Sequence, residues 1–250
     1  MVIAYFYVVF ALLGAAIGSF LNVIVDRLPQ KQSLVFPPSH CPACGRRLRV
    51  LDLVPVFSYL GLRGRCRYCQ SPIPRRILGV EFGTMAGFVL LLWRYGLSLE
   101  LVIACFYWSL LTVIMVIALE RRTILDRVFY PAVVIILIMD YISGDPGLLN
   151  GLLGAGVGLI VMIPLGLGRG SLGWGDVKMA GLAGLMLGFP EGLVSLMIAV
   201  LAAGLMIGWR WLLRATGRKK TAGFIPFLAV ATMVMLLWGQ NITGWYLSLF

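Results

Sequence analysis

The sequence predicts an all-α membrane protein that carries a small water-soluble insertion near its N-terminus. Of its 250 residues, 60% are hydrophobic and only 12% are charged, a composition that indicates membrane spans rather than a water-soluble domain. The net charge of +11 could indicate nucleic-acid binding. The basic residues, however, fall in loops between the apolar runs, as they do on the cytoplasmic face of membrane proteins. We therefore expect a lipid bilayer, and no nucleic acid, as a partner.

Eight apolar runs predict about eight transmembrane helices. They cover residues 3–25, 78–95, 99–119, 128–143, 148–167, 176–190, 192–213 and 224–248. The first run is long and lacks a basic start, so we expect a true span rather than a cleavable signal peptide. If the N-terminus lies outside and each span crosses once, every Lys and Arg except Arg94 falls on the cytoplasmic side. The opposite orientation would break the positive-inside rule almost everywhere.

Residues 28–77 are basic rather than apolar and contain two cysteine pairs. They predict a cytosolic insertion between the first two spans. So small a module needs a metal or disulfides in addition to its core. Two Cys-x-x-Cys pairs are typical of a structural zinc site, whereas two disulfides fit poorly with a basic and therefore cytosolic segment. The predicted zinc ligands are Cys41, Cys44, Cys66 and Cys69. We expect three parts: a first helix at 1–27, the insertion at 28–77 and a membrane-embedded core at 78–250.

The stretch Gly173-Trp174-Gly175-Asp176-Val177-Lys178 places a carboxylate at or just inside the membrane surface. An acid there is costly unless it is paired, solvated or catalytic, so Asp176 is a candidate functional residue. The alternative is a loop acid that faces water. The only histidine is His40, which excludes Ser-His-acid sites and His-Glu-x-x-His metal sites. Two carboxylates remain possible, one ionised to activate water and one protonated to polarise a peptide carbonyl.

Several motifs together resemble one known family. They are Gly18-Ser19-Phe20-Leu21-Asn22-Val23, Arg27-Leu28-Pro29, Cys41-Pro42-x-Cys44, Asp52-Leu53-Val54-Pro55-Val56, Ser58-Tyr59-Leu60, Leu62-Arg63-Gly64-Arg65-Cys66-Arg67-x-Cys69, Pro72-Ile73-Pro74, Glu81, Gly173-x-Gly175-Asp176-Val177-Lys178 and Ile225-Pro226-Phe227. Over nearly its whole length the chain resembles the type IV prepilin leader peptidases, also called prepilin peptidase and N-methyltransferase (peptidase family A24).

The resemblance implies a GxGD-type aspartic endopeptidase of the bacterial inner membrane, with its active site and zinc insertion facing the cytoplasm. Such an enzyme removes the basic leader from type IV prepilin or pseudopilin precursors. It then methylates the new N-terminus with S-adenosylmethionine. Asp176 would be one catalytic aspartate. The candidates for substrate binding are Glu81, Glu120, Asp126 and Lys178.

One position departs from the family pattern Asp-x-(Asp/Glu)-(five residues)-Asp, whose first aspartate is catalytic. Glu120 and Asp126 match the later acids, which puts Ala118 at the catalytic position. The peptidase should be impaired, because two acids that act as a unit lose most of their effect when one is removed. An engineered Asp→Ala change that keeps a substrate intact is the economical explanation; a natural inactive relative is the alternative. A shifted register with Glu120 as the catalytic acid would displace Asp126 from its place in the pattern.

Two other classes of protein are alternative interpretations of the sequence. A polytopic transporter or channel would use the membrane acid to bind ions, but the acids here gather on one side rather than at the midplane, where transporter sites lie. A non-enzymatic anchor would use the zinc module to recruit partners to the membrane. Leader cleavage by a variant with aspartate at position 118 would separate these readings from a peptidase.

Overall fold

The computed structural model describes residues 2–121, 123–144, 146–167, 173–212 and 223–248, and outside the insertion these are almost entirely helical. A long helix lies at each predicted span, which confirms the all-α prediction for the described residues. These helices are α1 (Val2–Arg27), α3 (Arg75–Tyr95), α4 (Leu99–Arg121), α5 (Asp126–Ser143), α6 (Leu148–Leu167), α7 (Trp174–Leu187), α8 (Glu191–Leu212) and α9 (Ile225–Leu247).

Six of the described helices are long and apolar enough to cross a membrane: α1, α3, α4, α6, α8 and α9. Helix α7 has only 14 residues and is therefore about 21 Å long, less than the thickness of a bilayer core of about 30 Å. Helix α5, with 18 residues and an internal proline, is also outside this group. The number of eight spans is thus not confirmed, although the eight helices are present.

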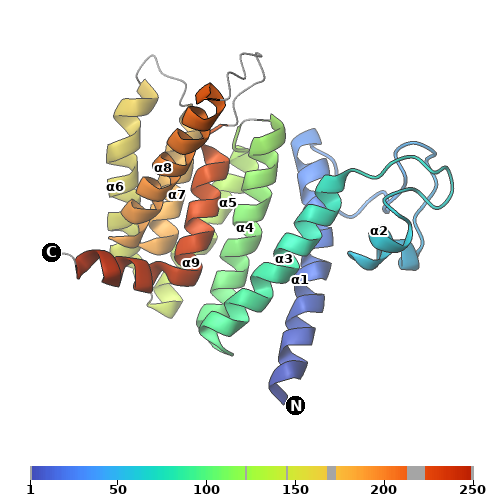
Figure 1. Ribbon diagram of the computed structural model, residues 1–250, viewed down its shortest axis with the longest axis horizontal. Helices are drawn as coiled ribbons and strands as arrows, with labels where there is room; N and C mark the ends of the chain where they lie inside the picture. Colours follow the sequence, from blue (N-terminus) through green and yellow to red (C-terminus); the bar gives the residue numbers. More distant parts are fainter. Residues whose placement is uncertain (1, 122, 145, 168–172, 213–222, 249–250) are drawn as a thin grey trace. The chain divides into compact units, whose positions relative to one another are not determined.

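The chain divides into two compact units, residues 1–113 and 114–250, and the division falls inside α4. The N-terminal unit contains α1, the insertion, α3 and the first part of α4 (Figure 1). The insertion contains two short 3-10 helices, η1 (Leu28–Gln30) and η2 (Val50–Leu53), and a short helix α2 (Phe57–Gly61). The C-terminal unit contains the rest of α4 and α5 to α9.

In the N-terminal unit, α1 and α3 pack at backbone distance through two glycines. A Cβ atom on Gly18 would lie 2.8 Å from the Cα of Glu81, and one on Gly14 would lie 2.8 Å from the carbonyl oxygen of Thr84. Only glycine permits so close an approach. This contact gives a structural role to the two glycines, which stand four residues apart in the first apolar run.

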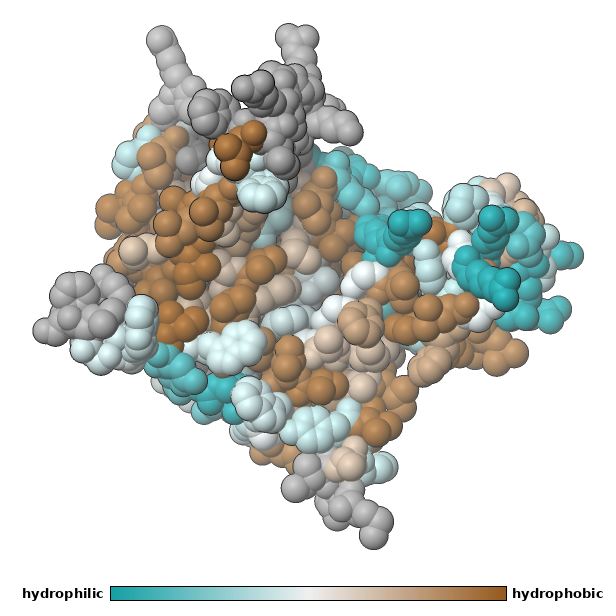
Figure 2. Space-filling view, viewed as in Figure 1, coloured by the Kyte–Doolittle hydropathy of each residue, from teal (hydrophilic) through white to brown (hydrophobic). Residues whose placement is uncertain are grey.

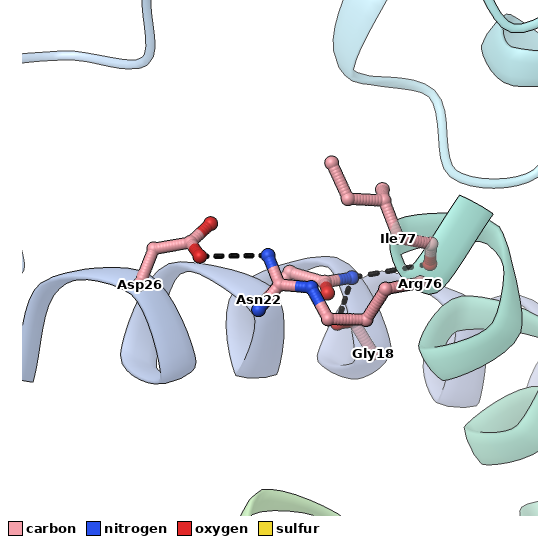
Figure 3. Close-up of polar contacts among 5 residues, drawn as sticks. All are labelled: Gly18, Asn22, Asp26, Arg76 and Ile77. Carbon is pink, nitrogen blue, oxygen red and sulfur yellow. Dashed lines mark hydrogen bonds and ion pairs between the residues drawn. The ribbon is translucent and has the colours of Figure 1, made fainter. Parts of the chain in front are cut away.

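The last turns of α1 are joined to the first turn of α3 by polar side chains (Figure 3). The Asn22 amide nitrogen donates to the carbonyls of Gly18 and Ile77, each at 3.2 Å. One turn further along α1, Asp26 pairs with Arg76 at 2.6 Å. The ends of the two helices that flank the insertion are therefore held side by side.

In the C-terminal unit, α7 is the central helix. Residues 179–186 are buried on all sides, and α5, α6, α8 and α9 all contact α7. The contact with α6 again uses glycines, because a Cβ atom on Gly154 would lie 2.3 Å from the carbonyl oxygen of Gly184. The surrounding helices thus fix the position of Asp176 at the start of α7.

Candidate catalytic and metal sites

The insertion brings its four paired cysteines together. Their sulfur atoms all lie within 4.8 Å of one another, and those of Cys41 and Cys69 are 3.7 Å apart. A tetrahedral zinc ion with Zn–S bonds of about 2.3 Å separates its sulfur ligands by about 3.8 Å. All four thiols are free rather than joined in disulfides. A hydrogen bond from the backbone N–H of Cys44 lowers the pKa of the Cys41 thiol to about 6, whereas burial and the neighbouring cysteines raise that of Cys44 to about 11, so Cys41 is the thiol that ionises more readily. The cluster can therefore hold zinc.

The two Cys-x-x-Cys pairs lie in two separate backbone turns that have the same hydrogen-bond pattern. In each, the N–H of the first cysteine donates to the carbonyl five residues later, and its carbonyl accepts from the residue four later. The donor and acceptor pairs are Cys41 to Arg46 (2.9 Å), Gly45 to Cys41 (2.8 Å), Cys66 to Ser71 (2.9 Å) and Gln70 to Cys66 (3.0 Å). The fourth residue after each first cysteine has a left-handed backbone, with φ of 68° at Gly45 and 59° at Gln70. The two turns are therefore conformational copies that present four sulfur ligands.

An ion pair fastens the second of these turns to η2. The Asp52 Oδ1 atom accepts from Arg67 Nε at 2.6 Å, and its Oδ2 atom accepts from the backbone N–H of Arg49 at 3.1 Å. Desolvation raises the pKa of Asp52, but these two hydrogen bonds outweigh it and hold the pKa below the ordinary value of 3.8. The sequence showed Asp52 as part of a motif but not its partner, which lies 15 residues away.

Glu81, predicted to bind substrate, is buried in the N-terminal unit at 5% exposure. Its Oε2 atom accepts the backbone N–H of Val56 at 2.7 Å. Val56 has a positive φ of 63°, which is uncommon for a β-branched residue, so this hydrogen bond stabilises an unfavourable turn. The contact fixes the insertion to α3, and a substrate-binding role for Glu81 remains a prediction.

Asp176 lies in the first turn of α7 with a half-satisfied carboxylate. Its Oδ2 atom accepts the backbone N–H of Gly173 at 2.8 Å. Its Oδ1 atom is buried and makes no hydrogen bond of standard geometry with the described residues, although the backbone N–H of Ile225 also faces the carboxylate. A buried acceptor without a donor is costly, and the positive end of a helix favours a nearby carboxylate. The arrangement leaves Oδ1 available to a water, a substrate or a second acid.

Residues 118–126, which resemble the family's first catalytic motif, come close to the first turn of α7. A Cβ atom on Gly175 would lie 3.5 Å from the backbone nitrogen of Ile124. At the end of α4, Ala118 is 1% exposed, whereas Leu119 and Glu120 are exposed. Of positions 118, 119 and 120, only 118 therefore has a buried side chain. That it faces Asp176 remains a prediction.

Asp126 and Lys178, both predicted to bind substrate, form an ion pair. The Lys178 ammonium also lies 5.5 Å from the ring centroids of Phe129 and Tyr130, a cation–π distance. The pair joins the first turn of α5 to the first turns of α7, two residues after Asp176. The structure thus connects the two motif stretches, while Glu81 belongs to the other unit.

Comparison with known proteins finds two family models that match successive parts of the chain. Residues 12–95 match the model of the bacterial peptidase A24 N-terminal domain, and residues 105–208 match that of the type IV leader peptidase family. A prepilin leader peptidase/N-methyltransferase of Pseudomonas putida is 31% identical over 96% of this chain and 93% of its own length. The chain belongs to the prepilin leader peptidase/N-methyltransferase family.

Other members of the prepilin leader peptidase/N-methyltransferase family have comparable sequence identity to this chain. The one from Aeromonas hydrophila is 30% identical over 98% of this chain and 95% of its own length. The one from Bacillus subtilis (strain 168) is 28% identical over 94% and 96%. No solved structure is significantly similar to the chain. The family resemblance predicted from the motifs is confirmed, and the type IV leader peptidase match spans both position 118 and Asp176.

Proposed function

We propose that the chain binds type IV prepilin or pseudopilin precursors at the cytoplasmic side of the bacterial inner membrane and that its peptidase step is impaired by Ala118. The observation that carries this proposal is that two stretches that resemble the family's catalytic motifs, residues 118–126 and residues 173–178, contact each other. Ile124 lies against Gly175, and Asp126 pairs with Lys178. The buried residue of the first stretch, where the family pattern requires the first aspartate, is alanine.

The chemistry of cleavage requires two carboxyl groups in opposite protonation states. One takes a proton from the attacking water, and the other donates a hydrogen bond to the peptide carbonyl. Asp176, with its unpartnered Oδ1 atom, supplies one of them. A methyl group at position 118 can neither accept nor donate a proton, so the second role is vacant. Ala118 therefore favours binding of a precursor without cleavage, as expected of a substrate trap or a natural inactive relative.

Two cofactors belong to the proposal. Zinc would be structural, held by the four sulfur atoms whose spacing fits a tetrahedral ion. The N-methyltransferase activity named for the relatives requires a methyl donor, for which we propose S-adenosylmethionine. We assign no residue of this chain to its binding. Because methyl transfer needs no carboxylate at position 118, we expect this activity to persist on a precursor that is already cleaved.

The orientation follows from the charge distribution. If all eight helices cross once and the insertion lies inside, Arg94 is the one Lys or Arg of the sequence placed outside, in agreement with the positive-inside rule. A precursor would then present its apolar helix to the bundle and its basic leader to the cytoplasmic ends of the helices. Glu120 is exposed there and, although it also has an interaction within the protein, its charge can attract the leader. Glu81 and the Asp126–Lys178 pair are already engaged within the protein, so their contribution to binding would require rearrangement.

The decisive experiment is to replace Ala118 with aspartate. We expect Ala118→Asp to raise the rate of leader cleavage by orders of magnitude while barely changing precursor affinity, the pattern of a group that acts in the transition state. Cleavage of a purified precursor in lipid vesicles can be followed by mass spectrometry. Leu119→Asp is the matched control, because it places the same acid on the exposed neighbouring position and should remain inactive.

Three results would overturn the proposal. Efficient cleavage by the unmodified chain would mean that another acid, with Glu120 tested first through Glu120→Gln, occupies the catalytic position. An inactive Ala118→Asp protein that still binds precursor would mean that the register is wrong. Failure of both proteins to bind any precursor would favour the transporter or anchor reading.

A further inference from the structure

Residues 50–60 of the insertion, called here the apolar segment, turn the polar groups of Asp52 and Tyr59 inward and most of their apolar side chains outward. The side chain of Asp52 is only 3% exposed, and the Tyr59 hydroxyl donates to the carbonyl of Ile73 at 3.4 Å. In contrast, Val50 is 82% exposed and Phe57 is 64% exposed. The exposed apolar side chains are Val50, Leu51, Leu53, Val54, Phe57 and Leu60. A surface that contacts water has the opposite arrangement, and a contiguous apolar patch marks an interaction site.

The apolar segment is held at the depth of the membrane boundary. Helix α3 has 21 residues and is therefore about 31 Å long, close to the bilayer core of about 30 Å. The segment is tied by the Val56–Glu81 hydrogen bond of 2.7 Å to a residue six positions after Arg75, which is about 9 Å along the helix axis. Figure 1 accordingly shows α2 level with the first turns of α3 rather than beyond its end.

The apolar surface is continuous with the surface that the helices present to lipid. Next to Glu81 on α3, Phe82 is 56% exposed, and on the paired helix α1, Phe20 is 52% exposed. On the face shown in Figure 2, hydrophobic residues extend from the insertion onto the adjoining helices, and hydrophilic residues gather toward its outer tip.

The charges around the segment match an anionic surface. Between Arg49 and Arg63 the only charged residue is Asp52, which is paired with Arg67. Arg49, Arg63 and Arg65 are exposed and lie at the two ends of the segment. Basic side chains beside a membrane surface are attracted to anionic lipid headgroups, and long basic side chains can keep their stems in the apolar region.

We propose that the apolar segment inserts into the headgroup–acyl boundary of the same bilayer that the helices cross, with anionic lipid as its partner. The insertion would then be an interfacial module, anchored by Glu81 from within and by lipid from outside. Its zinc turns would be held at the membrane surface instead of moving freely on their two connections. This proposal is independent of the chemistry at position 118.

Photo-crosslinking in vesicles tests the proposal. The full-length protein carries p-benzoylphenylalanine in place of Phe57 or, separately, of Leu60, and is reconstituted into phosphatidylethanolamine and phosphatidylglycerol. The control carries the same label in place of Arg47, an exposed residue beside the first cysteine pair. After illumination, mass spectrometry measures the fraction of protein with a lipid adduct. Thermal unfolding of each labelled protein is compared with that of the unlabelled one, and the two segment positions serve as independent tests.

We expect lipid adducts at positions 57 and 60 to exceed those at 47 severalfold, with phosphatidylglycerol overrepresented relative to its share in the vesicle. Adduct fractions equal to those of the control would overturn the proposal. So would a predominance of crosslinks to residues 114–250 or to a second copy, since the apolar segment would then be a protein interface. Adducts that only mirror the vesicle composition would contradict the anionic partner.

Discussion

Gly45 shows how a single residue shapes the metal site. Its φ of 68° is a conformation that glycine adopts freely and that costs other residues about 1–2 kcal/mol. Nothing lies within 4 Å of a Cβ atom at this position, so a substitution tests backbone conformation alone. Gln70 occupies the equivalent position of the second turn with a φ of 59°, which indicates that the second turn is already strained.

Gly45→Ala should therefore destabilise the insertion by about 1 kcal/mol without any steric clash. Gly61→Ala is the matched control, because Gly61 also has open space around its Cβ position but has no left-handed φ. Urea unfolding in detergent, followed by hydrogen exchange of the insertion, would measure both. A Gly61→Ala protein as unstable as Gly45→Ala would show that the backbone conformation is not the cause.

At the scale of elements, the pairing of α6 with α7 depends on which glycines face the contact. A Cβ atom on Gly154 would lie 2.3 Å from the Gly184 carbonyl oxygen, whereas one on Gly156 would meet nothing within 4 Å. Gly154→Ala must push the helices apart and should cost about 1–3 kcal/mol, the usual range for overpacking. Gly156→Ala should leave stability unchanged or slightly higher. Thermal unfolding in detergent compares the two, and equal melting temperatures would contradict this contact.

The Asp52–Arg67 pair predicts a pH dependence of the insertion. Because the folded pKa of Asp52 lies below its ordinary value of 3.8, the pair stabilises the fold at neutral pH. That stability should be lost as the pH falls below the ordinary value and through the folded pKa. Asp52→Asn should therefore be less stable than the unmodified protein at neutral pH and equally stable in strong acid.

Protonation of the cysteines would also release a bound metal in acid, so the informative quantity is the difference between the two proteins at each pH. Hydrogen exchange of residues 49–69 can provide it. A difference that stays constant from neutral pH to strong acid would show that the Asp52 charge is not responsible.

The helices could be predicted because a bilayer imposes both their length and their composition. The apolar run 148–167 coincides with α6, and the ends of all the other runs agree with the helices within three residues. The cysteine cluster could be predicted because its spacing is short and local. The Glu81–Val56 bond could not, since it joins residues 25 positions apart and depends on a backbone turn that no motif reveals. For the same reason, the Asp126–Lys178 pair emerged only when α5 and α7 were placed together.

At the scale of the whole molecule, the division into two units predicts which part of the chain loses its structure when the metal is removed. The four cysteine ligands all belong to the unit of residues 1–113, and within it the insertion is too small to fold well without them. Purified protein should contain one zinc per four-cysteine cluster. Cys66→Ser or a strong chelator should remove it and open residues 28–77 to proteases. The unit of residues 114–250 has its own buried helix α7 and should retain its thermal transition.

Cys105→Ser is the matched control, because Cys105 is a buried residue of α4 outside the cluster. It should keep both the zinc and the protease resistance of the insertion. Elemental analysis together with limited proteolysis and mass spectrometry measures all three proteins. Absence of zinc from the unmodified protein would refute the metal site. Simultaneous loss of the C-terminal transition on chelation would show that zinc stabilises the chain as a single cooperative structure, rather than through one unit.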